Sequence, residues 1–216
     1  MNWALAYTLP FAVFIALLAL ATLFPIPIWV RFAISCAAIL AVSRSVLLSD
    51  RIRKPLLSIL LGIAVFAIWV GPEILFPGYH RFWLFSNSIL GHPAASTPPK
   101  SQHDPVFLLF RILISVAVVP VIEELFWRGW LMRWLIDRDF ARVPLGTYNT
   151  QAFWIVAALF ASEHGSYWDV GLVTGAIYNW WMVRTRSLWS CILMHAVTNG
   201  CLAWFVIARG QWQYWL

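Results

Sequence analysis

A succession of long apolar runs is the feature that most constrains how this chain can fold. A helix needs about 20 apolar residues to cross a bilayer, and we predict seven crossings on that basis. They cover residues 3–24, 26–48, 56–76, 106–136, 151–164, 169–183 and 188–207. The fifth and sixth runs are short for full spans, which leaves room for a re-entrant or broken segment. The predicted fold class is therefore all-α: a polytopic transmembrane helical bundle of about seven or eight membrane helices.

The composition excludes a soluble protein. Hydrophobic residues make up 62% of the 216 residues and charged residues 11%, which is too few charges for a water-exposed surface. The net charge of +6 does not indicate a nucleic-acid partner, because the basic residues form short clusters beside the apolar runs. Cys36, Cys191 and Cys201 lie inside apolar runs without CxxC spacing, so neither disulfides nor a zinc knuckle is predicted.

The distribution of basic residues predicts an integral membrane protein with its N-terminus in the cytoplasm. Three alternate connections carry most of the positive charge, and positive charge concentrates on the cytoplasmic side of membranes. The residues concerned are Arg44, Arg51, Arg53, Lys54, Arg133, Arg138, Arg142, Arg184 and Arg186. The first run lacks a basic flank and a small-residue cleavage site, so we interpret it as a helix and not as a signal peptide.

The long polar connection at residues 77–104 contains His80, His92 and His103. Their spacing matches no metal-ligand pattern, and the surrounding Pro, Ser and Gly residues are typical of a solvated loop. We therefore predict no metal site there.

Three charged side chains interrupt the fourth apolar run in the stretch "VPVIEELFWRGW". An ionisable residue within a membrane segment is costly and indicates a function. Glu124 and Arg128 are four residues apart, so on a helix they share a face and can neutralise one another. Glu123 points about 100° away and is the better catalytic candidate. Pro120, which lacks an N–H group, is expected to kink or open the helix nearby.

Two further segments place polar groups in apolar surroundings. "FASEHG" spaces Phe160 and His164 four residues apart, and "HAVTNG" does the same for His195 and Asn199. Counted from the basic helix ends, Glu123 and His195 both lie about 15 Å deep, with His164 deeper in the fifth helix. These groups are therefore expected to converge.

Converging carboxylate, imidazole and carboxamide groups can hydrolyse an amide. A carboxylate and an imidazole can activate a water molecule, while a second imidazole and a carboxamide stabilise the oxyanion. Neither a GxSxG elbow nor an HExxH helix is present. An alternative in which Glu123, His164 and His195 bind a metal that activates water remains open at this point.

The motifs "EELFWR", "FASEH" and "HAVTN", in this order, resemble the EExxxR, FxxxH and HxxxN/D motifs of the CPBP intramembrane proteases. This family includes the CAAX prenyl endopeptidases and proteins tied to bacteriocin processing or immunity. The resemblance implies one membrane domain over residues 1–216 with a motif core at about 106–207. The length and "WVGPE", residues 69–73, are also similar to the branch found with bacterial exosortase systems.

The resemblance implies a glutamate-type endopeptidase without a metal or other cofactor. Glu123 and His164 would activate the water, His195 and Asn199 would stabilise the oxyanion, and Glu124 and Arg128 would play supporting roles. The implied setting is the bacterial inner membrane. The implied partners are membrane lipid and a peptide or protein substrate, prenylated or carrying a sorting signal.

Two alternative functions stay open. A CPBP-type scaffold or immunity protein would keep the motifs and act by binding, and a proton-coupled transporter would use the buried carboxylate and histidines as a relay. Glu163, directly before His164, is interpreted as an interface charge or as a group that tunes the histidine. Asp169 is interpreted as a helix cap or dipole partner.

Overall fold

The computed structural model describes residues 3–95 and 97–215, and the described chain is built from helices without a β-strand. The longer helices and the turns that join them are α1 (Trp3–Leu23), α2 (Ile28–Ala38), η1 (Ile39–Ser43), α3 (Arg44–Ser49), α4 (Pro55–Leu75), α5 (Pro105–Leu113), η4 (Ile114–Val118), α6 (Val119–Glu124), η5 (Leu125–Leu131), α7 (Met132–Trp134), α8 (Thr150–Ser162), α9 (Trp168–Thr185) and α10 (Leu188–Arg209). Short 3₁₀ turns are η2 (Tyr79–Arg81), η3 (Pro99–His103), η6 (Phe140–Arg142), η7 (Gly165–Tyr167) and η8 (Trp212–Tyr214). The predicted all-α bundle is confirmed.

Five helical segments within the described residues are long and apolar enough to cross a membrane. They are Trp3–Leu23, Ile28–Ser49, Pro55–Leu75, Pro105–Trp134 and Leu188–Arg209. The predicted fifth crossing is the shorter apolar helix α8, and the sixth is α9, which is not among the five. The buried face of α9 includes the polar residues Thr174, Asn179 and Thr185, which explains its weaker apolar character.

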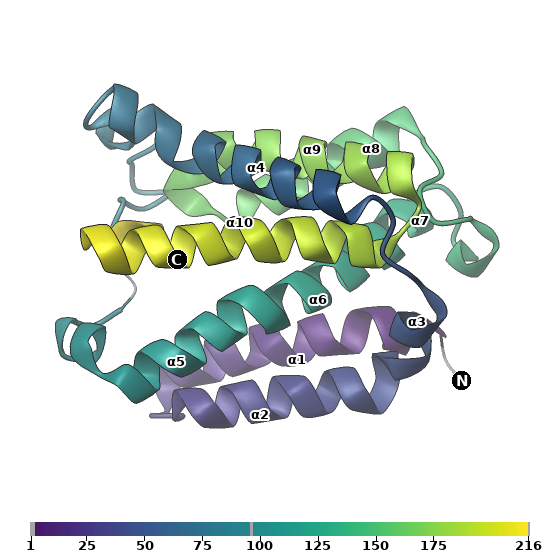
Figure 1. The fold of residues 1–216 in the computed structure, drawn as a ribbon, viewed down its shortest axis with the longest axis horizontal. Coiled ribbons are helices and arrows are strands. Elements are labelled where there is room, and N and C mark those ends of the chain that lie inside the picture. The colour runs from purple at the N-terminus through teal and green to yellow at the C-terminus, as the bar shows by residue number, and fades with distance from the viewer. Residues whose placement is uncertain (1–2, 96, 216) are drawn as a thin grey trace.

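The helices form layers around a central diagonal segment (Figure 1). The continuous run α5–η4–α6–η5–α7 crosses the middle of the molecule. The α1–α2 hairpin packs on one side of it, and α10 packs on the other. Helix α4 packs along α10, while α8 and α9 pack against each other behind α4. The central segment is thus the part of the chain that faces both layers.

Proline opens the backbone of this central segment. In η4 the N–H of Val119 donates to the carbonyl of Ile114, five residues back, which is the π-helical pattern. The next N–H in this pattern would reach the carbonyl of Ser115, but residue 120 is proline and has no N–H. The carbonyl of Ser115 is therefore left for a side chain. This agrees with the prediction that Pro120 opens the helix nearby.

The loop at residues 77–104 is only partly the solvated loop that the sequence predicted. His92 and His103 are exposed, but His80 is 1% exposed and lies between two carboxylates. Its Nε2 is 3.2 Å from Oδ1 of Asp169, and its Nδ1 is 3.5 Å from Oε2 of Glu73. The prediction was wrong for His80 because Glu73, seven residues before it, and Asp169, far away in the sequence, hold it against the ends of α4 and α9.

Candidate functional site

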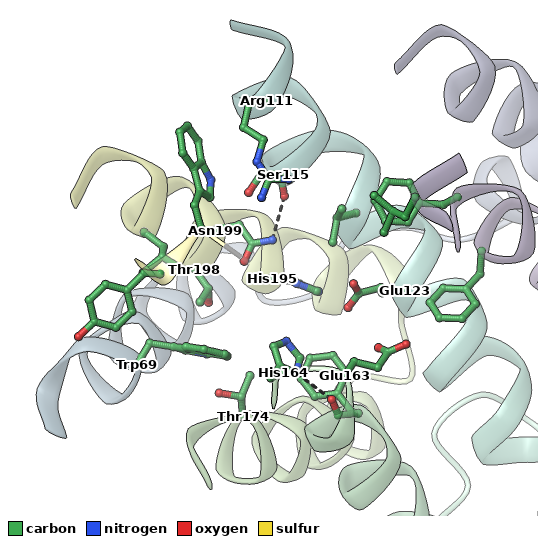
Figure 2. A pocket seen from close by; sticks show the side chains of 18 of the residues that line it. Trp69, Arg111, Ser115, Glu123, Glu163, His164, Thr174, His195, Thr198 and Asn199 are labelled. Atoms are coloured by element: carbon green, nitrogen blue, oxygen red, sulfur yellow. Dashed lines mark hydrogen bonds between the residues drawn. The ribbon is translucent and has the colours of Figure 1, made fainter. Parts of the chain in front are cut away.

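A cavity of about 420 Å³ lies between the central segment, α1, α4, α9 and α10. Glu123, His164, His195 and Asn199 all line it, and Figure 2 shows them around a common space. The convergence expected from the sequence is present. One placement was wrong: α8 ends at Ser162, so His164 lies in the turn before α9 and not inside a helix.

The pairing predicted between Glu124 and Arg128 is confirmed. Both side chains are 0% exposed, and Nη1 of Arg128 lies 3.1 Å from Oε1 of Glu124. The same guanidinium donates from Nε to Oδ1 of Asn179 at 2.9 Å and packs on the rings of Phe160 and Tyr178. Asn179 was missed by the sequence reasoning, because a lone amide inside α9 carries no motif. This network neutralises a buried charge.

Glu123 faces the other way, as the helical geometry predicted. It lines the cavity, whereas Glu124 does not. Its Oε2 is buried and has no hydrogen-bond partner among the described residues. A buried oxygen without a partner is costly. Glu123 is therefore a carboxylate that faces a cavity and forms no ion pair with another described residue.

His164 is held in one tautomer. Its Nδ1 lies 2.8 Å from the carbonyl oxygen of Phe160, and a carbonyl can only accept, so Nδ1 carries the proton. In the neutral ring Nε2 is then an acceptor. The ring packs against Trp69 and Phe160 at centroid distances of 5.2 and 4.8 Å, which fix its plane. The arrangement suits a group that accepts a proton or a hydrogen bond from water.

His195 has a different partner. Its Nδ1 lies 3.0 Å from Oε1 of Glu124, the oxygen that also binds Arg128. A carboxylate can only accept, so Nδ1 of His195 carries a proton, and Nε2 donates as well when the ring is doubly protonated. His164 and His195 therefore differ in their anchors: a backbone carbonyl holds the first ring, and a buried carboxylate holds the second.

Asn199 is fixed by the opened backbone of the central segment. Its Nδ2 donates to the carbonyl of Ser115 at 2.8 Å, the oxygen that Pro120 leaves without a backbone donor (Figure 2). An amide nitrogen carries two hydrogens, so one N–H remains for a group in the cavity.

Glu163 and two arginines complete the charged lining. Glu163 is exposed as a residue and also lines the cavity beside His164. Arg31 of α2 and Arg111 of α5 line it as well. Neither arginine was singled out as a cavity residue from the sequence, because each is a single charge near the end of an apolar run.

The cavity offers no evident metal site. Within residues 3–95 and 97–215, no three His, Cys, Asp or Glu side chains are placed to hold a metal ion together. The alternative in which Glu123, His164 and His195 are ligands thus gains no support from their geometry.

Comparison with known proteins finds similarity to a protein family. A family model described as "Type II CAAX prenyl endopeptidase Rce1-like" matches residues 105–201, a stretch that contains all three motifs. No curated protein and no solved structure matches the chain. The likeness to the exosortase-associated branch stays a prediction. The segment that contributes Glu123, His164, His195 and Asn199 to the cavity is therefore similar to the Rce1-like type II CAAX prenyl endopeptidases, over somewhat less than half of the chain.

Proposed function

We propose that this protein is an intramembrane endopeptidase that hydrolyses a peptide bond of a membrane-associated substrate through a water molecule activated by Glu123 and His164. The observation that carries the proposal is the shared cavity, in which an unpartnered carboxylate faces two imidazoles and a carboxamide.

In the first step Glu123 removes a proton from the water molecule as its oxygen attacks the scissile carbonyl carbon. Nε2 of His164 accepts a hydrogen bond from the same water and orients it. The carbonyl oxygen becomes an oxyanion, which receives hydrogen bonds from Nε2–H of protonated His195 and from the free N–H of Asn199. The proton held by Glu123 then passes to the leaving nitrogen as the C–N bond breaks, so Glu123 is regenerated.

Glu124 and Arg128 act through other residues. Glu124 holds Nδ1 of His195, and Arg128 ties Glu124 to Asn179 on α9. They position the donor histidine and neutralise the buried charge, and neither lines the cavity.

The wall of the cavity supports a membrane-associated substrate. Helix α1 contributes the apolar side chains Phe11, Phe14, Ile15 and Leu18 to the lining. Ile15 and Leu18 are also 43% and 39% exposed on the outside of the bundle. In a bilayer this wall borders lipid, so a substrate attached to lipid can enter from the side. A prenylated peptide, as named in the description of the matching family, is one such substrate, and a peptide with a membrane-inserted sorting signal is another.

The test uses an internally quenched peptide that ends in a farnesylated CAAX sequence, incubated with the protein in proteoliposomes. An unfarnesylated peptide and a peptide with an apolar sorting-signal segment are tested in parallel. We expect cleavage by the wild-type protein and a loss of kcat of about 10²- to 10⁴-fold in Glu123→Gln, the range for removal of a general base.

The matched control is His92→Ala, an exposed histidine that does not line this cavity. It should cleave as the wild type does. A Glu123→Gln protein that still cleaves would overturn the mechanism. If the wild type binds the peptides but cleaves none, the result supports the scaffold function. If Glu123→Gln instead abolishes a proton flux across the proteoliposome membrane, the result supports the transporter function.

A further inference from the structure

Thr174 of α9 is a buried threonine whose hydroxyl does not bond to its own helix. A threonine inside a helix can donate to the carbonyl four residues back, as Thr185 of α9 does to Trp181 at 2.8 Å. Thr198 of α10 makes the same kind of bond to Met194 at 3.1 Å. Thr174 is 2% exposed, but its Oγ1 has no hydrogen-bond partner among the described residues. Its hydroxyl is therefore buried and unsatisfied.

The place of Thr174 is the wall of the cavity on which His164 rests. Thr174 lines the same cavity as Glu123 and His164. Figure 2 shows it beside His164, across the common space from Asn199. Gly171, three residues earlier on the same face of α9, has no side chain, and a Cβ there would lie 3.3 Å from Nδ1 of His164. The face of α9 that packs on the catalytic histidine thus also carries the unsatisfied hydroxyl.

Other polar groups of the lining have a partner or an assigned role. The hydroxyl of Thr198 receives a hydrogen bond from Tyr178 at 3.0 Å and lies 3.0 Å from the carbonyl of Gly62. The four residues of the proposed mechanism contact the water and the oxyanion. Thr174 has neither a partner in the described part of the chain nor a role in that mechanism.

A peptide that enters the cavity brings backbone groups of its own. Inside a bilayer each N–H and C=O must find a partner within the protein, and a group left without one is costly. A threonine hydroxyl can accept from an N–H and donate to a carbonyl. The hydroxyl of Thr174 is therefore suited to an amide of the peptide that lies beside the bond to be cleaved.

We propose that the hydroxyl of Thr174 binds a backbone amide of the peptide substrate next to the scissile bond and so places that bond against the water between Glu123 and His164. This inference rests on the proposed function, because it positions the substrate relative to that water. The amide next to the scissile bond is unchanged by the reaction, so the hydrogen bond is equally strong in the ground state and in the transition state. Its loss raises KM and leaves kcat almost unchanged.

The first test measures cleavage of the quenched farnesylated peptide by Thr174→Val protein in proteoliposomes. Valine has nearly the shape of threonine and no hydroxyl, so we expect KM to rise about two- to tenfold, the range for one neutral hydrogen bond, with kcat within about twofold of the wild type. Thr174→Ser, which keeps the hydroxyl, should keep KM near that of the wild type.

The matched control is Thr185→Val, the same substitution at a buried position of the same helix that does not line the cavity. It removes the bond to Trp181 and should lower stability without changing KM. Thr174→Val removes no bond between described residues, so its unfolding curve should match that of the wild type. An unchanged KM in Thr174→Val, or an equal rise in Thr185→Val, would overturn the proposal. A lower kcat with an unchanged KM would also overturn it, because the hydroxyl would then act on the water or the oxyanion.

The second test locates the hydrogen bond on the peptide. Each amide next to the scissile bond is replaced in turn by an ester, which has no N–H and a weaker acceptor. The affinity of these labelled peptides for Glu123→Gln protein, with and without Thr174→Val, is measured by fluorescence anisotropy. At one position the ester should weaken binding about two- to tenfold and should have no further effect in Thr174→Val protein. Independent effects at every position would show that Thr174 binds no backbone amide.

Binding also separates this proposal from the proposed function. Peptide binding to Glu123→Gln protein that depends on Thr174, without cleavage by the wild type, would keep the hydrogen bond and remove the protease. Cleavage by the wild type with the same KM in Thr174→Val would keep the protease and remove the hydrogen bond.

Discussion

Adjacent glutamates on one helical turn have opposite surroundings in this protein. Glu124 is 0% exposed and contacts Arg128 and His195, which lie at 3.1 and 3.0 Å from its Oε1. Glu123 forms no ion pair in the described part of the chain and lines a cavity of about 420 Å³. One residue of helical rotation separates a carboxylate that links helices from one that faces the cavity.

The contrast shows how a membrane protein can keep an acid without an ion pair in its interior. Arg128 and His195 bind Oε1 of Glu124, and Arg128 also binds Asn179, so the side of the helix that faces α9 and α10 links these helices together. The other side is then free to carry a group without a partner, whose cost the rest of the fold offsets.

The largest loss of stability is expected from breaking the ion pair between Glu124 and Arg128. Arg128→Met leaves Glu124 as a buried charge without its guanidinium and removes the bond to Asn179. Losing one member of a buried ion pair costs about 3–5 kcal/mol, so the unfolding free energy in detergent should fall by that amount. Unfolding monitored by tryptophan fluorescence measures it.

The control for this variant is Arg209→Met, which removes an exposed arginine and should leave the unfolding curve unchanged. The double variant Glu124→Gln, Arg128→Met should recover part of the loss, because no uncompensated charge remains. An Arg128→Met protein as stable as the wild type would break the comparison, since the pair would then not hold the bundle.

A smaller effect is expected from the same isosteric change at the two neighbouring positions. Glu124→Gln weakens the bonds to Arg128 and His195, and hydrogen bonds to charged groups contribute about 1.5–3 kcal/mol each. Glu123→Gln removes no observed bond and replaces a buried acid without a partner. We expect Glu124→Gln to lower the unfolding free energy by about 1–3 kcal/mol and Glu123→Gln to leave it the same or raise it.

Equal losses of stability in the two variants would show that Glu123 has a structural partner as well. Cleavage is measured on the same samples, so that the two variants are compared in activity as well as in stability. Glu123→Gln should be folded and inactive, whereas Glu124→Gln should be less stable and retain some activity, because it acts through His195.

The sequence alone could predict the part of the site that depends on helical spacing. Glu124 and Arg128 pair and Glu123 lines the cavity, as the spacing predicted, although Arg128 lies in η5 (Leu125–Leu131), which is π-helical and was not expected from the sequence. The apolar runs also predicted the five long membrane helices, because the length and composition of a run are local properties of the sequence.

Long-range contacts could not be predicted in this way. His80 occurs in a polar loop, and only the packed structure brings Asp169 to its ring. The partners of Arg128 on α9, and the presence of Arg31 and Arg111 in one cavity, depend on which helices lie side by side. His164 was expected inside a helix, but the last turn of α8 ends before it, and the exact end of a helix is the least reliable feature of a sequence pattern.

The smallest loss of stability is expected from a variant of Asn199, which binds the backbone that Pro120 opens beside the cavity. Asn199→Ala removes the donor to the carbonyl of Ser115, which should cost about 1 kcal/mol of stability and about 10²- to 10³-fold in kcat if the second N–H stabilises the oxyanion. Adding Pro120→Ala restores an N–H five residues after Ser115, where the π-helical pattern can use it. The double variant should therefore regain stability but not activity, whereas Pro120→Ala alone, with Asn199 present, should cleave within a few-fold of the wild type. Recovery of cleavage in the double variant would mean that Asn199 serves only to satisfy the backbone that proline opened, and that the oxyanion is bound by His195 without it.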